Sequence, residues 1–263
     1  MSATVHPTAI LDKSVELGAD VSVGPYCILG PNVKLGARTR LVAHVFIERE
    51  TTLGEDNVVH PYAALGQPAQ DTSYRDEATS LTVGAGNVIR EYVSMHRGTV
   101  RSRGTTLVGD GGYFMAQSHV AHDCIVGDNV IFAQGATLGG HVQVGDHVIM
   151  GGLSAMHQYG RIGRHAFVGG LAAVVADVIP YGSVFGNHAQ LAGLNVIGLK
   201  RRGFSREAVH DLRAAYRLLF AEEGTFQERL DDVAETYAHE PLVQEIVAFI
   251  RAEAQRPLCM PHA

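Results

Sequence analysis

Apolar residues recur at every sixth position through most of this chain. One run extends from Val5 to Leu65, a second from Val83 to Met95 and a third from Val108 to Val174, and all 26 of these positions are apolar. Because apolar residues make up only 46% of the chain, chance does not account for the series. Neither a helix, with a period of 3.6, nor a simple strand, with a period of 2, produces a repeat of six. A short strand followed by a tight corner does.

Two neighbouring positions of each hexad carry small residues. The residue after the apolar position is glycine in 14 hexads, and the residue two before it is small or β-branched, as at Val21, Cys27 and Cys124. Glycine adopts corner backbone angles at low steric cost. Three hexads would form one triangular coil of about 18 residues. Stacked coils would form a parallel β-helix of about nine coils, roughly 43 Å long at ~4.8 Å between strands. We expect both cysteines to pack inside it.

Two polar segments interrupt the hexads, at residues 67–82 and about 97–106. Both are interpreted as loops expelled from the prism, where binding groups concentrate. The alternative is that they are tolerated insertions without function. The second segment adds positive charge through Arg97, Arg101 and Arg103.

The hexads fade after Val174, and a helical spacing begins near Ser205. Ser205 is a plausible N-cap, Thr225 with Glu228 a possible capping box, and Pro241 a plausible first residue of a third helix. We therefore predict an all-β solenoid plus α: a β-helix over residues 1–190 and a C-terminal α-helical domain over residues 191–263. The helices would cover the open end of the prism.

Composition narrows the classes of function. The 263 residues carry a net charge of −6, which argues against bulk nucleic-acid binding. No apolar run approaches the ~20 residues that span a bilayer, so no integral membrane segment is expected. Three cysteines without a spaced framework, and an N-terminus unlike a signal peptide, favour the cytoplasm. The 30 glycines, the absence of Trp and the 7% aromatic content fit a narrow, repetitive interior.

The 14 histidines require an explanation, and the densest polar constellation surrounds His122. This residue lies two positions after an inward apolar residue, hence at a corner, and Asp123 follows it. A neutral imidazole can accept a proton, and a carboxylate can orient and stabilise the ring. One coil further on lie Gly140 and His141, and a second coil brings up residues 156–158.

His147 and His165 stand 18 residues apart in one corner slot that also holds Asn129. We interpret them as a structural ladder.

Other chemistries are less well supported. His119, His122 and His141 leave a zinc site open, because some β-helix enzymes hold zinc between subunits with three histidines. The spacing does not fix such a ligand set, and no metal is predicted. No serine lies in a G-x-S-x-G turn, and Cys124 points inward, which argues against a nucleophile. No phosphate-binding or dinucleotide fingerprint is present, and we expect no cofactor.

Residues 200–206 carry four positive charges within seven residues. This basic segment could bind phosphate or an acidic partner. The alternative is a solvated start of a helix.

Four local segments add to the hexads and the helical tail: His96-Arg97-Gly98-Thr99, Ala121-His122-Asp123-Cys124, Gly186-Asn187-His188-Ala189 and Gly198-Leu199-Lys200-Arg201-Arg202-Gly203-Phe204-Ser205. The hexads alone indicate the hexapeptide transferase superfamily. With the four segments, essentially the whole chain resembles the acyl-[acyl-carrier-protein]–UDP-N-acetylglucosamine O-acyltransferase family, which performs the first step of lipid A biosynthesis.

The resemblance implies a left-handed parallel β-helix, an exception to the usual right-handed crossover. It implies a homotrimer with active sites between adjacent prisms. The family transfers a (R)-3-hydroxyacyl chain from acyl carrier protein to the 3-hydroxyl of UDP-N-acetylglucosamine.

Residue by residue, the resemblance implies that His122 is the general base, Asp123 its orienting partner and the Gly140 N–H the oxyanion donor. Arg202 and its basic neighbours would suit the acidic carrier protein. Contacts to the nucleotide sugar and the acyl chain are implied for Gln70, Asp71, His119, His141, His157, Gln158, His188, Asn195 and Arg201.

The chain departs from the family at one position. The family often has Lys two residues after the loop aspartate, and this chain has Ser73 there. We expect that contribution to be missing or supplied elsewhere, with Arg75 as one candidate. Gly170 matches a position that resembles a chain-length ruler, and its lack of a side chain suggests a longer acyl chain.

Three rival functions stay open. A related hexapeptide enzyme could acylate an amino sugar at nitrogen, which would give an amide product in place of an ester. A trimeric metal hydratase of the carbonic anhydrase type would contain metal. A scaffold that only binds nucleotide sugar would show no turnover.

Overall fold

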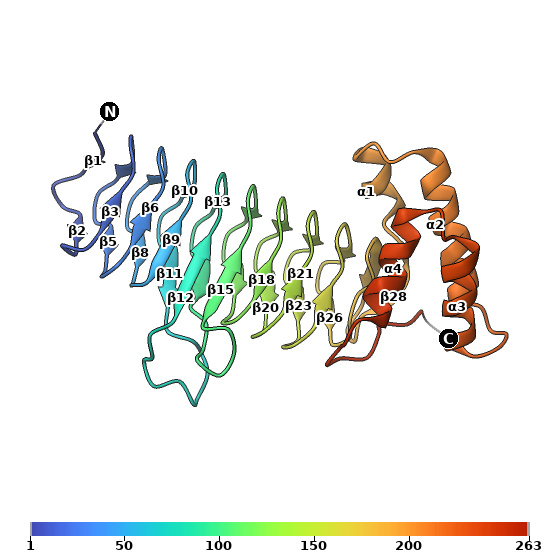
Figure 1. The fold of residues 1–263 in the computed structure, drawn as a ribbon. Helices are drawn as coiled ribbons and strands as arrows, with labels where there is room; N and C mark the ends of the chain where they lie inside the picture. The colour runs from blue at the N-terminus through green and yellow to red at the C-terminus, as the bar shows by residue number, and fades with distance from the viewer. Residues whose placement is uncertain (1, 262–263) are drawn as a thin grey trace.

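The chain folds into three β-sheets wound as a left-handed parallel β-helix, with helices at its C-terminal end (Figure 1). The structure is a computed structural model and describes residues 2–261. Each apolar hexad position lies in one of the first 26 strands. Partners within a sheet lie one coil apart, as the pairing of Ser22 with Arg40 illustrates. The predicted fold class is confirmed.

Successive strands are assigned to the three sheets in turn. The first sheet contains β1 (Thr4–Val5), β4 (Ser22–Val23), β7 (Arg40–Leu41), β10 (Val58–Val59), β13 (Val88–Ile89), β16 (Tyr113–Phe114), β19 (Ile131–Phe132), β22 (Ile149–Met150), β25 (Phe167–Val168), β27 (Gly182–Phe185) and the antiparallel β28 (Gln190–Leu194). The second contains β2 (Ile10–Leu11), β5 (Ile28–Leu29), β8 (Phe46–Ile47), β11 (Ala64–Gln67), β14 (Ser94–His96), β17 (His119–Val120), β20 (Thr137–Leu138), β23 (Ala155–Met156) and β26 (Ala173–Val174). The third contains β3 (Glu16–Leu17), β6 (Lys34–Leu35), β9 (Thr51–Leu53), β12 (Ser80–Val83), β15 (Thr105–Val108), β18 (Ile125–Val126), β21 (Gln143–Val144) and β24 (Arg161–Ile162).

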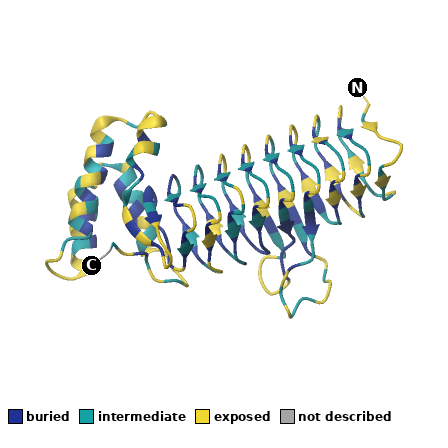
Figure 2. Cartoon of the chain, turned by 180° about the vertical axis from the view of Figure 1, so that it is seen from behind, coloured by how far each residue is buried: buried dark blue, intermediate teal, exposed yellow. Residues whose placement is uncertain are grey.

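The core lies inside the prism and is filled by the two inward positions of each hexad. Val21 and Val23 are buried together, and the same pair of positions is buried in the coils that follow (Figure 2). Cys27 and Cys124 are fully buried free thiols, which confirms their predicted packing role. Burying this apolar surface supplies the main driving force for folding.

The corners hold non-glycine residues in the left-handed backbone region, such as His147 and His165, both with φ of 58°. That conformation costs roughly 1–2 kcal/mol per residue. Stacking on the next coil offsets part of the cost, since the two imidazole rings lie 4.6 Å apart at 14°. The predicted structural ladder is confirmed, and Tyr181 extends it above His165.

The two polar interruptions are loops that project from the same edge of the prism (Figure 1). Residues 68–79 connect β11 to β12, and residues 97–104 connect β14 to β15. Both loops therefore leave at the corner between the second and third sheets. After each loop the chain rejoins the stack, because β12 pairs with both β9 and β15.

Four helices follow the sheets: α1 (Val196–Arg201), α2 (Arg206–Leu219), α3 (Phe226–Thr236) and α4 (Pro241–Arg251). The N-cap of α2 is Ser205, α3 has the Thr225–Glu228 capping box, and Pro241 is at the start of α4, so the three predicted starts are confirmed. The short α1 was not predicted. No helix within residues 2–261 has the length and apolar character to cross a membrane.

The helices dock on the C-terminal end of the stack through partly buried polar contacts. Arg164 Nε lies 2.7 Å from the Glu245 carboxylate of α4, and Tyr181 donates to the same carboxylate. The chain after α4 returns to the stack, where Cys259 N donates to Asp177 O at 2.8 Å. The division into residues 1–190 and 191–263 stays a proposal, and β28 begins at that boundary.

Candidate active site

The edge of the prism between the second and third sheets concentrates the polar groups. Residues 68–79 and 97–104 leave the stack there, and the next corners of the same edge contain His122 with Asp123 and then Gly140 with His141. Strand β17 ends just before the first of these corners and β20 just before the second, and the two strands pair in register. Coil stacking therefore brings these four residues together, as predicted.

His122 and Asp123 form a hydrogen-bonded pair. His122 Nδ1 donates to Asp123 Oδ2 at 2.9 Å, which leaves Nε2 as the proton acceptor. The Asp123 side chain is fully buried and also accepts from Thr99 N at 3.0 Å and from Thr99 Oγ at 2.8 Å. Burial would raise the pKa of Asp123, but the hydrogen bonds from His122 and Thr99 outweigh it and hold the pKa below its usual value.

Gly140 lies directly against the His122 ring. A Cβ at this position would come within 2.5 Å of Cε1 and 2.6 Å of Nε2 of His122, so only glycine fits beside the ring in this position. Among the described residues, no hydrogen-bond acceptor faces the Gly140 N–H. An N–H with these properties can serve a developing negative charge near His122.

His141 and Tyr159 extend the edge by one coil each. The His141 ring stands perpendicular to His122 at 5.0 Å and stacks on Tyr159 at 4.4 Å. Its Nε2 lies 3.9 Å from Asp123 Oδ2. Burial lowers the pKa of His141, with His122 and Arg103 acting in the same direction and Asp123 against it. His141 is therefore an uncharged side chain that lines the site. Tyr159, which stacks on it, was not predicted from the sequence.

His119 lies in β17 of the second sheet, the strand that leads directly into the His122 corner. Its Nδ1 is 2.7 Å from Ser94 Oγ, and its ring meets His96 edge-on at 5.0 Å. Burial, reinforced by His96 and His122, lowers the pKa of His119 to about 4. The predicted contact residue is thus an uncharged histidine close to the His122 pair.

The loop of residues 68–79 contains the predicted contacts Gln70 and Asp71. Gln70 is exposed, and the Asp71 carboxylate accepts from Ser73 N and Ser73 Oγ, both at 2.7 Å. These bonds lower the pKa of Asp71, and the nearby Arg101 acts in the same direction. Ser73 therefore orients Asp71. Arg75 donates to the carbonyls of Thr72 and Tyr74 within its own loop.

His157 and Gln158 lie next to Tyr159, one coil beyond His141. Both are exposed, and the C-terminal Arg256 binds them through His157 Nδ1 at 2.7 Å and Gln158 O at 3.0 Å. Arg256 is a second residue that sequence reasoning missed, because it is 98 positions from Gln158 in the chain.

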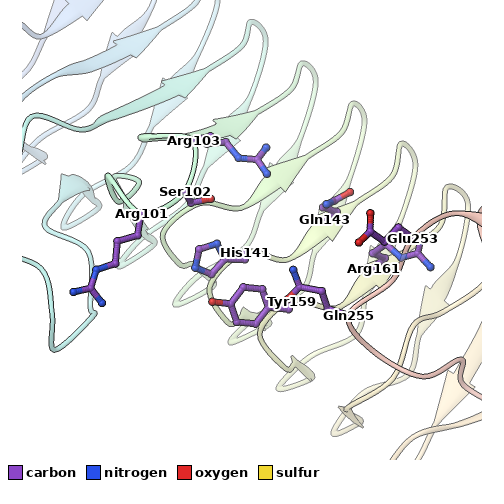
Figure 3. Close-up of a pocket in the computed structure, with 9 residues that line it drawn as sticks. All are labelled: Arg101, Ser102, Arg103, His141, Gln143, Tyr159, Arg161, Glu253 and Gln255. Atoms are coloured by element: carbon purple, nitrogen blue, oxygen red, sulfur yellow. The ribbon is translucent and has the colours of Figure 1, made fainter.

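A polar pocket of about 430 Å³ lies beside His141 and Tyr159 on the third sheet (Figure 3). Arg101 to Arg103 line one side of it, and Glu253 and Gln255 the other. Arg97 does not belong to this basic group: its side chain is fully buried, so the prediction that it adds to the surface charge is wrong.

The remaining predicted residues gather on a different face. Asn195, Arg201 and Arg202 line a mainly apolar pocket of about 520 Å³ over the first sheet, with Ile149 and Phe167. Arg202 turns inward and donates to His147 O at 3.0 Å, whereas Arg201 is exposed. The exposed residues Gly170 and His188 lie at the edge between the first and second sheets. One chain therefore presents two groups of predicted contacts that do not meet.

The arrangement permits metal binding at one place among the described residues. One ligand atom each from His122, Asp123 and His141 falls within 4.8 Å of the others. Asp123 Oδ2, however, already accepts hydrogen bonds from Thr99 and His122. The geometry fits proton transfer by an oriented histidine better than a ligand set.

Comparison with known proteins gives consistent matches. Residues 177–259 match a family described as "Udp N-acetylglucosamine O-acyltransferase; Domain 2". The chain is 60% identical to the acyl-[acyl-carrier-protein]–UDP-N-acetylglucosamine O-acyltransferase of Caulobacter vibrioides over 98% of both chains, and 58% identical to that of Azorhizobium caulinodans over 98% and 96%. The crystal structure of UDP-N-acetylglucosamine O-acyltransferase from Moraxella catarrhalis superposes with a TM-score of 0.93 at 41% identity, over 97% of this chain and 99% of that one.

Proposed function

The chain belongs to the acyl-[acyl-carrier-protein]–UDP-N-acetylglucosamine O-acyltransferase family, and we propose that it performs this acyl transfer with His122 as general base. The acyl group is a (R)-3-hydroxyacyl chain, the acceptor is the sugar 3-hydroxyl, and the reaction is the first step of lipid A biosynthesis. One observation carries the mechanism: His122, oriented by a buried Asp123, packs its ring directly against Gly140, whose N–H has no hydrogen-bond acceptor among the described residues.

The base is needed because a sugar hydroxyl has a pKa far above neutrality. As the hydroxyl oxygen attacks the thioester carbonyl, His122 Nε2 takes its proton, and Asp123 stabilises the imidazolium that forms. The Gly140 N–H donates to the oxyanion of the tetrahedral intermediate. Collapse of this intermediate breaks the carbon–sulfur bond, and the imidazolium returns the proton to the thiolate of the carrier protein.

The substrate contacts call for more than one copy of the chain. His122 lies at the edge between the second and third sheets, while Asn195 and Arg201 line a pocket on the first sheet. We infer a homotrimer of three-sided prisms in which the pocket of one chain faces the His122 edge of the next. The exposed basic residues Lys200, Arg201 and Arg206 supply a surface for the acidic carrier protein.

Mixed assemblies test the shared site. His122→Ala and Arg201→Ala place one defect on each proposed side, and mixing the two dissociated variants should restore activity in sites built from their intact faces. A mixture that stays as inactive as its components would contradict the shared site. Light scattering should give three times the mass of the chain.

The three free, buried cysteines support a cytoplasmic location.

The decisive experiment is His122→Ala, assayed with UDP-N-acetylglucosamine and 3-hydroxyacyl carrier proteins of several lengths. We expect transfer to be abolished while calorimetry still detects UDP-sugar binding. Near-full activity would overturn the general-base assignment. Mass spectrometry of the wild-type product must show an ester, because an amide would indicate the rival N-acyltransferase.

A metal hydratase is the second candidate, favoured only by the proximity of His122, Asp123 and His141. Metal analysis of purified protein and the acyl-transfer assay decide between the two. Stoichiometric metal in a protein that shows no acyl transfer would favour the second candidate.

A further inference from the structure

The segment His96–Thr99 begins at the last residue of β14. It contacts both the 68–79 loop and Asp123, yet the mechanism assigns it no role. His96 Nδ1 donates to Pro68 O at 2.7 Å, at the start of the 68–79 loop. Arg97 N donates to Gln67 O at 2.9 Å. Thr99 binds Asp123. Three of four consecutive residues thus connect the substrate loop to the proton-transfer pair.

Arg97 holds the loop of residues 68–79 from below. Its fully buried guanidinium donates from Nη1 to Gly66 O at 2.8 Å and from Nη2 to the Tyr74 hydroxyl at 3.1 Å, and Nη2 lies 3.6 Å from the Asp76 carboxylate. Arginine stays charged, so its burial is costly unless it is paired. Tyr74 and Asp76 are loop residues, and moving the loop would leave the buried charge without these partners.

Glu48 lies on the other side of the same guanidinium, 3.9 Å from Nη1. Its Oε2 is buried and has no hydrogen-bond partner among the described residues. The positive charge of Arg97 therefore faces two carboxylates, that of Asp76 in the loop and that of Glu48 on the other side. A test must keep that charge and remove only the forked geometry, which Arg97→Lys does.

Thr99 fixes the Asp123 carboxylate on the opposite side of the segment. The backbone N–H of Thr99 lies 3.0 and 3.1 Å from the two carboxylate oxygens, and its hydroxyl donates to Oδ2 at 2.8 Å. Oδ2 is also the acceptor of the His122 Nδ1 bond. The Thr99 hydroxyl thereby determines how Asp123 meets the imidazole.

We propose that His96–Thr99 is a positioning element that sets the substrate loop and the proton-transfer pair relative to each other. Arg97 positions the loop that carries Asp71, and Thr99 positions Asp123. The inference rests on the proposed function, because Asp71 is the sugar contact and His122 the base. Although Arg97 and Thr99 are only two residues apart, they should control different kinetic constants.

Steady-state kinetics separates the two roles. Arg97→Lys should raise KM for UDP-N-acetylglucosamine about 10-fold with kcat within about 3-fold of wild type, because one charge-assisted hydrogen bond to the loop is lost. Thr99→Val should lower kcat about 10-fold with KM nearly unchanged. Thr99→Ser keeps the hydroxyl and is the matched control, with near-wild-type kinetics.

A purely structural role predicts another pattern: both variants would lose the same fraction of active protein, with KM unchanged. That result, or a Thr99→Val variant whose KM rises as much as its kcat falls, would overturn the proposal. If Arg97→Lys does not fold, Tyr74→Phe removes the loop hydroxyl that accepts from Arg97 and that also donates to Glu77 O within the loop. It should raise KM about 3-fold, and an unchanged KM would overturn the loop assignment.

Calorimetric binding of UDP-N-acetylglucosamine separates this inference from the proposed function. Arg97→Lys should weaken binding about 10-fold, and Thr99→Val should leave it unchanged. Wild-type protein that binds the nucleotide sugar but transfers no acyl group would refute the proposed function while the Arg97 effect on binding remains. Equal binding by wild type and Arg97→Lys would refute the inference alone.

Discussion

Gly140→Ala is the sharpest test of the site geometry. The added Cβ would lie 2.5 Å from His122 Cε1 and 2.6 Å from Nε2. Carbon atoms pack at about 3.5–4.0 Å, so the imidazole must retreat by about 1 Å. Backbone atoms are not in the way, because the three nearest heavy atoms all belong to that ring. The perturbation therefore falls on the proton acceptor and not on the fold.

The expected loss follows from this displacement. A 1 Å misplacement of a reacting group can cost about 100-fold in rate, which corresponds to about 2.7 kcal/mol. The retreating ring also strains its 2.9 Å bond to Asp123. Weakening a hydrogen bond to a charged group costs about 1–2 kcal/mol of unfolding free energy. We expect kcat to fall at least 100-fold, with a loss of about 1–2 kcal/mol of unfolding free energy.

The assay measures transfer rates, nucleotide-sugar binding and urea unfolding side by side. Gly152→Ala is the matched control for stability, because its Cβ would meet no heavy atom closer than 3.5 Å. In a His122→Ala background there is no ring to displace, and Gly140→Ala should then cost no further stability. A Gly140→Ala enzyme with kcat within 3-fold of wild type would refute the placement of Gly140 against the base.

Two further predictions concern pH and chain length. Burial, with His147 and Arg202 adding to it, lowers the pKa of His165 to about 4. Because this lies below the unfolded value of about 6.5, the stability contribution is complete above pH 6.5 and is lost as the pH falls toward 4. His165→Asn should reduce the loss of unfolding free energy between pH 7 and pH 4.5 by about 2–3 kcal/mol in urea titrations, and equal losses would contradict the assignment. Gly170→Met should shift the preference to shorter acyl chains in competition assays, whereas a wild type that favours short chains over long ones would refute the ruler hypothesis.

The repeat made the prism predictable because each coil imposes the same demands as the last. An inward position such as Val120 recurs every six residues, so its burial could be inferred from spacing alone. The same arithmetic placed His122 beside Gly140 and His147 beside His165. Regular spacing is the only signal required at these positions.

The loops have no period, and the predictions there were weaker. Arg97 lies in a polar stretch that suggests a surface, yet it is fully buried because Gly66 and Tyr74 supply its hydrogen bonds. Arg256 reaches His157 from the far end of the chain, a contact that no local pattern encodes. The helix α1 is only six residues long, too short for an amphipathic pattern to stand out.

Equivalent positions along one edge of the prism recur at a fixed spacing of one coil. Gly152 and Gly170 occupy one edge, a coil apart, and a side chain introduced at either would stand about 4.8 Å from one at the other. Leu153 and Leu171 are exposed at the same two corners, so the side chains of this edge also lie at levels one coil apart. If the proposed chain-length ruler lies along this edge, the same substitution made at Gly152 and at Gly170 should give preferred acyl lengths that differ by several methylene groups, because the two positions are one coil apart.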